Sequence, residues 1–187
     1  MEFNKPVSNP MLVGCIELLK AEDTPKYRSM FMTELQKSCL LAPVRIDPAP
    51  EEDEEGNLRI IPGSSIQFPM LLTKDGRKFF MGFTDDREYQ LWVEKNQPCP
   101  TFSLVFDDYI GMMLRKDPEG NTSQAEGIVV NPFGSNMMVH KDMLAQVMAG
   151  RMIHALQQGE ERPAQKLRIP APSDKGAPAT GEVDEGV

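Results

Sequence analysis

The clearest alternation of hydrophobic and polar residues lies around an Asp75-Gly76 pair. Apolar runs cover residues 66–72 before this pair and residues 78–83 after it. Glycine tolerates the positive φ that a tight turn requires, so Asp-Gly between two such runs predicts a β-hairpin. Phe79, Met81 and Phe83 alternate along the second run and should share one face of its strand.

A helix is predicted directly after this hairpin. Thr84 or Asp85 can cap its first turn, and Glu88 stands three residues after Asp85, which is the spacing of a capping box. Tyr89 and Trp92 then follow at helical spacing, so they mark the buried face of the helix.

Apolar residues at helical spacing predict four more helices. Two of them begin with a capping residue followed by proline, Asn9-Pro10 and Thr24-Pro25. The four helices are expected over residues 10–21, 25–38, 107–114 and 140–157. The first two lie only a few residues apart, which predicts a helical hairpin.

Three other apolar runs, residues 39–46, 101–106 and 128–130, predict strands. The last run has no polar alternation, as expected of an interior strand that is covered on both faces. With the hairpin they predict a single α/β (α+β) domain over residues 1–158. Its mixed sheet should have about five strands, with the Asp-Gly hairpin at its centre and helices packed on it.

The composition changes at residue 159. Residues 159–187 have no aromatic side chain and repeat proline, glycine and alanine among charged residues. Such a segment cannot bury enough apolar surface to offset the entropy lost on ordering. We predict a disordered, acidic tail.

The net charge of −8 disfavours nucleic acid as a partner, because phosphate neutralisation needs a basic face. No apolar run is long enough to span a bilayer, and the first residues lack a signal-peptide pattern. The three cysteines are far apart and form no Cys-x-x-Cys motif, which argues against a disulfide framework. We expect a cytoplasmic protein with reduced thiols and no membrane partner.

Several short motifs occur in a characteristic order. They are Phe31-x3-Leu35-x2-Ser38-x-Leu40-x2-Pro43, Asp75-Gly76, Phe83-Thr84, Trp92 and Gly127-x3-Asn131-Pro132-Phe133. In this order they resemble the SseB protein N-terminal domain over about residues 24–157. The resemblance implies a bacterial protein with the helix and strand order predicted above. It implies no defined reaction and therefore supplies no catalytic residue. Many SseB-like proteins continue into a second, C-terminal domain, whereas here only the predicted tail follows.

The residues themselves suggest no catalytic site. His140 and His154 are predicted on one helix about four turns apart, roughly 20 Å, so they cannot share a metal or a proton relay. The sequence has no metal-ligand spacing, no phosphate-binding loop and no local Cys-His signature. We expect no enzyme, no metal and no cofactor, unless folding assembles a carboxylate pair or a Cys-His pair.

The best candidate ligand site follows the interior strand. Asn131, Ser135 and Asn136 offer polar contacts there, and Phe133 offers an apolar wall. Ligand crevices in open α/β sheets form beyond the carboxyl ends of strands. The alternative interpretation is a turn in which Asn131 bonds its own backbone before proline, and such turns are commoner than sites.

The last helix is the candidate partner-binding surface. Its apolar residues spread over about half of the helical circumference and include Met148, Met152 and Leu156. Methionine is adaptable and is frequent at protein-binding surfaces as well as in cores. We therefore expect a non-catalytic cytoplasmic module that binds another protein or itself. The alternative function is the sensing of a small molecule, a metabolite or an amino acid, at the loop around Asn131.

Overall fold

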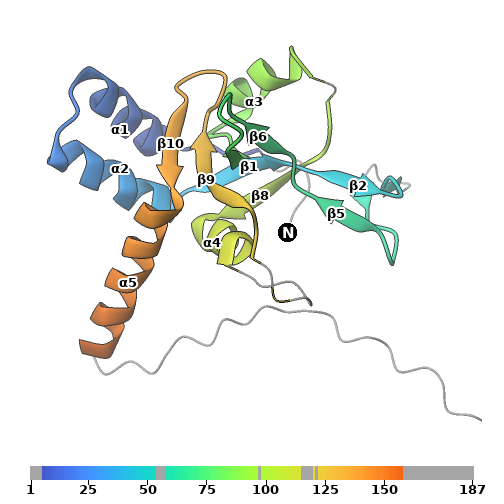
Figure 1. Cartoon of the computed structure of the whole chain (residues 1–187). Coiled ribbons are helices and arrows are strands. Elements are labelled where there is room, and N and C mark those ends of the chain that lie inside the picture. The colour runs from blue at the N-terminus through green and yellow to red at the C-terminus, as the bar shows by residue number, and fades with distance from the viewer. Residues whose placement is uncertain (1–5, 54–57, 97, 115–119, 121, 158–187) are drawn as a thin grey trace, which may run out of the picture. The chain divides into compact units, whose positions relative to one another are not determined.

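The computed structural model describes residues 6–53, 58–96, 98–114, 120 and 122–157 (Figure 1). The predicted tail, residues 159–187, lies outside these residues. Close contacts divide the chain into two compact units, Met1–Gly150 and Arg151–Val187. Every strand belongs to the first unit, and the second contributes only the helical residues 151–157 to the description. Helices and mixed strands together make an α+β protein, as predicted.

The helices begin and end close to their predicted bounds. They are α1 (Pro10–Ala21), α2 (Pro25–Lys37), α3 (Asp86–Val93), α4 (Phe106–Leu114) and α5 (Lys141–Gln157). Proline occupies the first turn of both α1 and α2, where no backbone N–H is needed. Thr24 caps α2 by accepting a hydrogen bond from the backbone N–H of Tyr27. Asn9 occupies the predicted N-cap position of α1, and its carbonyl accepts a hydrogen bond from the N–H of Val13, but its side chain makes no capping hydrogen bond.

The strands are shorter and more numerous than predicted. They are β1 (Cys39–Pro43), β2 (Arg45–Asp47), β3 (Glu51–Glu52), β4 (Leu58–Arg59), β5 (Ser65–Gln67), β6 (Met70–Leu72), β7 (Lys78–Gly82), β8 (Thr101–Val105), β9 (Ala125–Val130) and β10 (Met137–His140). The predicted strand at 39–46 is divided at Val44, whose N–H donates to the carbonyl of Pro100. The strand β10 was not predicted, because Met137-Met138-Val139-His140 has no alternation of apolar and polar residues.

The central sheet has four strands in the order β10-β9-β7-β6. Strands β7 and β9 are parallel, and the two outer pairings are antiparallel. The pair β1-β8 joins the end of β7 through a bridge in which Leu41 and Phe83 exchange two backbone hydrogen bonds of 2.9 Å. The Asp-Gly hairpin is thus β6-β7, with β7 as an interior strand.

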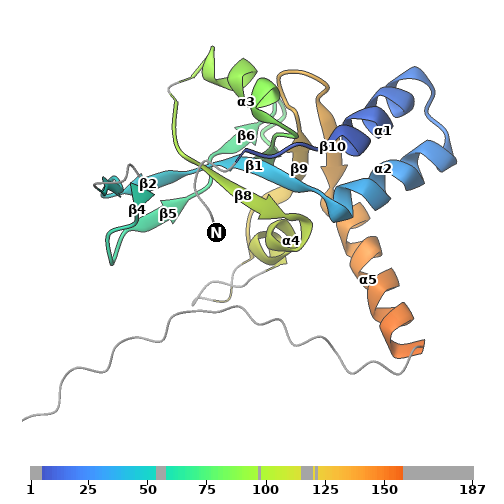
Figure 2. The same ribbon diagram turned by 180° about the vertical axis from the view of Figure 1, so that it is seen from behind.

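Strand β7 is buried on both faces. Phe80 faces the main core, which α1, α2, α4, β8 and the first turn of α5 complete. Met81 and Phe83 face a smaller core beneath α3, where Tyr89 stacks on Trp92 at 5.6 Å between ring centroids. Figures 1 and 2 show α3 and α4 on opposite sides of the strands. The hairpin and the capped helix therefore act as the centre of the fold.

A β-bulge at Glu126 and Gly127 interrupts the pairing of β9 with β7. Lys78 pairs with Ala125 and Phe80 with Ile128, so two residues of β9 oppose one of β7. Gly127 has φ of 155°, and a Cβ there would lie 2.1 Å from the carbonyl oxygen of Val139. The close approach of β10 to β9 therefore requires glycine at this position.

We predict that Gly127→Ala lowers the free energy of unfolding by about 2 to 4 kcal/mol, because the new methyl group displaces backbone rather than a side chain. Gly14→Ala in α1 is the control. Nothing lies within 4 Å of a Cβ there, so removing a helical glycine should stabilise by about 0.5 to 1 kcal/mol. Urea unfolding followed by Trp92 fluorescence measures both changes. A Gly127→Ala protein as stable as the parent would contradict this account of the bulge.

Candidate functional site

Asn131, the first residue of the predicted ligand loop, has its side chain inside the protein. It is 2% exposed, and its Oδ1 accepts a hydrogen bond of 2.9 Å from the backbone N–H of Thr84. Its Nδ2 donates to Thr84 Oγ1 at 2.9 Å. The single hydroxyl hydrogen of Thr84 has two acceptors within reach, Asp85 Oδ2 at 2.9 Å and Asn131 Oδ1 at 3.3 Å. The Asn131 amide thus fastens the end of β9 to the residue that follows β7.

The backbone of Asn131 closes the loop that follows it. Its carbonyl accepts hydrogen bonds from the N–H groups of Gly134 (3.1 Å) and Asn136 (2.7 Å). Both Asn131 and Asn136 have φ of 52°, the left-handed conformation that asparagine tolerates better than most residues. The turn thus forms, but the Asn131 side chain bonds Thr84 instead of its own backbone.

The other predicted ligand residues lie in the same loop but face different surroundings. Phe133 packs against the smaller core, and Lys95 Nζ lies 5.2 Å from the centroid of its ring. The side chain of Asn136 is exposed. Ser135 Oγ is buried and has no hydrogen-bond partner among the described residues. Of the four side chains, only that of Ser135 combines burial with an unused polar atom.

Glu88 of α3 reaches across to this loop. A Cβ at Gly134 would lie 2.1 Å from Glu88 Oε2, so a larger residue there would displace the carboxylate from its position. This oxygen is buried and, within the part of the chain that the structure describes, has no partner. The predicted capping box is half formed: Asp85 Oδ1 accepts from the N–H of Glu88 at 3.0 Å, while Oε2 of Glu88 lies against Gly134.

Burial and the nearby charge of Asp85 raise the pKa of Glu88, and Arg87 and Lys20 lower it less. A carboxyl group whose pKa is higher in the folded state binds its proton more tightly there than in the unfolded chain. The stability of the folded protein therefore falls as pH rises from the pKa of this group in the unfolded chain through its pKa in the folded protein, because the carboxyl group ionises over this range. A hydrogen-bond donor placed against Glu88 Oε2 would remove this cost.

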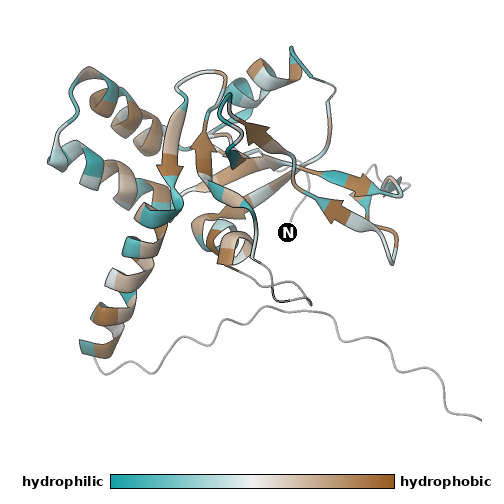
Figure 3. Ribbon diagram, in the orientation of Figure 1, coloured by the Kyte–Doolittle hydropathy of each residue, from teal (hydrophilic) through white to brown (hydrophobic). Residues whose placement is uncertain are grey.

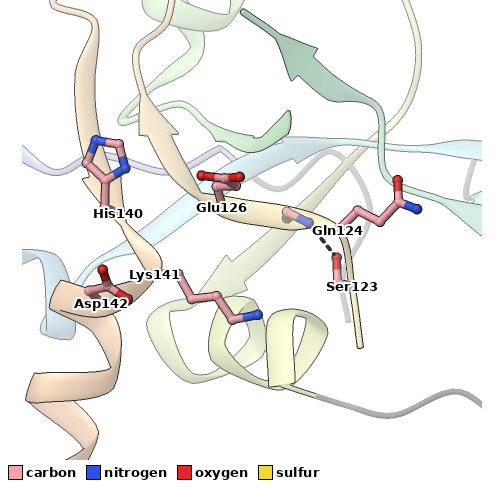
Figure 4. A pocket seen from close by; sticks show the side chains of 7 residues that line it. Ser123, Gln124, Glu126, His140, Lys141 and Asp142 are labelled. Atoms are coloured by element: carbon pink, nitrogen blue, oxygen red, sulfur yellow. Dashed lines mark hydrogen bonds between the residues drawn. The ribbon is translucent and has the colours of Figure 1, made fainter. Parts of the chain in front are cut away.

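A polar pocket of about 290 Å³ lies at the opposite end of the β9-β10 hairpin from this loop (Figure 4). It is lined by Ser123, Gln124, Ala125 and Glu126 at the start of β9, and by His140, Lys141 and Asp142 at the junction of β10 and α5. Figure 4 shows the side chains of His140 and Glu126 projecting from neighbouring strands on the same side. The sequence did not reveal this site, because only the pairing of His140 with Gly127 brings the two segments together.

A second hollow of about 300 Å³ is mainly apolar and lies between the α1-α2 hairpin, β10 and the first turn of α5. We call it the methionine groove. Its lining residues are Leu19, Lys20, Asp23, Arg28, Phe31, Met137, Met138 and Met143. Asp23 and Arg28 form an exposed ion pair with each other, whereas Lys20 has no ion pair or hydrogen bond within the described ranges. The groove therefore combines an apolar floor with a net positive rim.

The predicted partner-binding residues of α5 differ in their surroundings. Met148 is half-buried and packs against the main core, next to the fully buried Leu144. Met152 is 51% exposed and Leu156 is 72% exposed. Figure 3 shows hydrophobic residues on the last turns of this helix. The apolar arc is thus buried in its first half and exposed in its second half.

The described part of the chain brings no group of metal ligands together, and the pKa values of two of its three thiols are raised. No three His, Cys, Asp or Glu side chains there converge as metal ligands. None of Cys15, Cys39 and Cys99 forms a disulfide, and burial raises the pKa of the Cys15 and Cys99 thiols. A raised pKa disfavours the nucleophilic thiolate. No described helix is both long and apolar enough to cross a membrane.

The family model of the SseB protein N-terminal domain matches residues 12–146. These residues include the Asn131 loop, the polar pocket and the methionine groove. No significant match was found among curated proteins or among solved structures.

Asn131→Ala should lower the free energy of unfolding by about 2 to 4 kcal/mol, because it leaves the buried N–H of Thr84 without an acceptor. Asn136→Ala is the matched control, since Asn136 has the same φ of 52° and an exposed side chain. It should lose only about 1 kcal/mol, the cost of the left-handed conformation for a residue with Cβ. Chemical unfolding of the two variants separates these effects, and equal losses would exclude a special role for the amide of Asn131.

Proposed function

The chain belongs to the SseB protein N-terminal domain family, and from that premise we propose that it is a non-catalytic protein-interaction module. We place it in the bacterial cytoplasm, where its free cysteines would stay reduced. The observation that carries the proposal is the methionine groove, an apolar hollow at the surface with a positive rim. Its partner is a protein segment that inserts an apolar side chain and carries an acidic residue for Lys20.

The chemistry of the groove supports a protein ligand. Met138 and Met143 are 36% and 37% exposed, so an apolar side chain that covers them would remove hydrophobic surface from water. Unbranched methionine side chains adapt to the shape of a partner at little cost. A carboxylate at Lys20 would add charge-assisted pairing at the rim, which favours association rate and orientation.

The last turns of α5, which belong to the second compact unit, are a separate candidate interaction surface. Met152, Ile153 and Leu156 are exposed apolar residues of one helix. Exposed apolar residues that gather on one helix are typical of helix-binding surfaces. Met148 is less suitable for a test, because it packs against the core and a charge there would disturb the fold.

We predict that Met138→Glu combined with Met143→Glu weakens partner binding by at least about tenfold, because two carboxylates would enter an apolar contact. The partner is first captured in cells by a photo-crosslinking residue at position 138 and is then purified for titration. Leu72→Glu is the matched control, since Leu72 is 64% exposed on β6, outside the groove. Met152→Glu with Leu156→Glu tests the helix surface separately.

Three results distinguish self-association, docking at the methionine groove and docking at the last turns of α5. Sedimentation velocity of the unmodified protein shows whether the partner is a second copy of the chain. Binding that is equal for the groove variant and for Leu72→Glu would reject the groove as the docking surface. Loss of binding in the α5 variant alone would transfer the function to the last helix.

A second candidate function, the sensing of a metabolite or an amino acid at the Asn131 loop, is favoured by one observation. Glu88 Oε2 and Ser135 Oγ are both buried, and neither has a partner among the described residues. Buried polar atoms are normally hydrogen-bonded, so an unpartnered pair beside one loop suits a ligand that donates to Glu88.

For this second function, we expect at least one compound of a metabolite panel to raise the melting temperature with increasing concentration. Glu88→Gln or Ser135→Ala should abolish the rise, since the first replaces the carboxylate acceptor by an uncharged amide and the second removes the hydroxyl group. Asn136→Ala should retain it, because that side chain points to solvent. A panel without any such compound, or a rise that survives both loop variants, would count against sensing at this loop.

A further inference from the structure

The polar pocket of Figure 4 has a property that the proposed interaction function does not use. Charged side chains of both signs line the pocket, and none of them forms an ion pair with another described residue. Glu126, Lys141 and Asp142 line it, and none of their side chains forms a hydrogen bond or ion pair within the described ranges. Glu126 and Asp142 are exposed and Lys141 is half-buried, and all three border the same hollow.

Two features of the β9-β10 hairpin, the β-bulge and Gly127, position the residues that line this pocket. The bulge at Glu126 and Gly127 takes Glu126 out of the regular pairing of β9 with β7. Glycine at 127 then lets β10 approach so closely that His140 stands directly opposite it in the register. Bulges of this kind re-aim a side chain, and they are over-represented beside functional sites.

Three neighbouring contacts fix the walls of the pocket. The His140 ring meets Phe79 edge to face, with 5.5 Å between the ring centroids. Lys78 Nζ donates to Gln124 Oε1 at 2.6 Å and so holds the side chain at the other wall. Ser123 Oγ accepts from the N–H of Ala125 at 3.2 Å, which shapes the entry of the chain into β9. These contacts fix the walls of the pocket without involving the side chains of Glu126, Lys141 or Asp142.

The charges select among classes of ligand. A simple anion would meet the carboxylates of Glu126 and Asp142, and a simple cation would meet the ammonium of Lys141. An apolar molecule would strip water from all three charges without replacing it. A metal ion is disfavoured, since the described residues contain no converging set of three ligands.

We propose that this pocket binds a small zwitterion, a molecule that carries a protonated amine and an anionic group. The amine contacts the carboxylates of Glu126 and Asp142, and the anionic group contacts Lys141. Gln124 and His140 border the ligand and orient it. The hollow of about 290 Å³ has room for a small molecule that carries these two groups.

The test uses the full chain and a series of simple probes. Glycine, β-alanine and γ-aminobutyrate carry both charges at increasing separation, whereas acetate and methylammonium carry one each. Each probe is titrated to millimolar concentration while amide chemical shifts are followed by NMR. At least one member of the zwitterion series should give saturable shifts at residues 123–126 and 140–142. The singly charged probes should bind at least about tenfold more weakly, because one charge-assisted hydrogen bond is missing.

Charge-removing variants complete the test. Glu126→Gln and Lys141→Gln should each weaken the best probe by about tenfold, since each removes one charged contact. Glu94→Gln and Lys74→Gln remove the same charges at exposed positions outside the pocket and should leave binding unchanged. Glu126 is exposed, so its replacement does not threaten folding, and unchanged shifts elsewhere in the spectrum check this directly.

Three results would each overturn the proposal: no saturable shift with any zwitterion, equal binding of the singly charged probes, or unchanged binding in both pocket variants. The pocket shares no lining residue with the methionine groove. Failure here would therefore leave the proposed interaction function intact, and failure of the groove variants would leave the zwitterion site intact.

Discussion

The hydrogen bonds of Thr84 hold together the parts of this fold that are distant in sequence. Thr84 is fully buried at the end of β7, so its backbone groups need partners inside the protein. Its carbonyl accepts a bond of 2.7 Å from Asn9 Nδ2, and its N–H donates to Asn131 Oδ1. Asn9 Nδ2 also donates to the carbonyl of Cys39 at 2.8 Å. Two asparagine side chains thus join the start of α1, the start of β1 and the end of β9 to the central strand.

This arrangement explains which features the sequence predicts and which it does not. The hairpin at Asp75-Gly76 and the cap at Asp85 depend on neighbours within a few residues, and both formed as expected. Local sequence patterns also predicted a helix cap at Asn9 and a turn at Asn131. Their amides act instead across 75 and 47 residues, a separation at which local spacing carries no information.

The candidate surfaces were harder to predict from the sequence, because they also depend on contacts between distant residues. The polar pocket needs the register of β9 with β10, and that register depends on Gly127. The methionine groove needs the α1-α2 hairpin to lie beside β10, a strand that has no alternating pattern. By contrast, the exposed end of α5 belongs to a single helix, so helical periodicity alone placed Met152 and Leu156 on its apolar arc.

The hairpin β9-β10 places all three candidate sites of the first unit along its length. Its turn carries the Asn131 loop, its second strand begins at the methionine groove, and its open end forms the polar pocket. Among the described strands, β10 pairs with β9 alone, so its position depends on that single ladder. Asn131 anchors one end of the ladder to Thr84, and Gly127 permits the closest approach at the other. Both ends of the β9-β10 ladder are thus fixed by contacts within the protein. A ligand at any of the three candidate sites would therefore require little ordering of the backbone, and such preorganisation favours affinity.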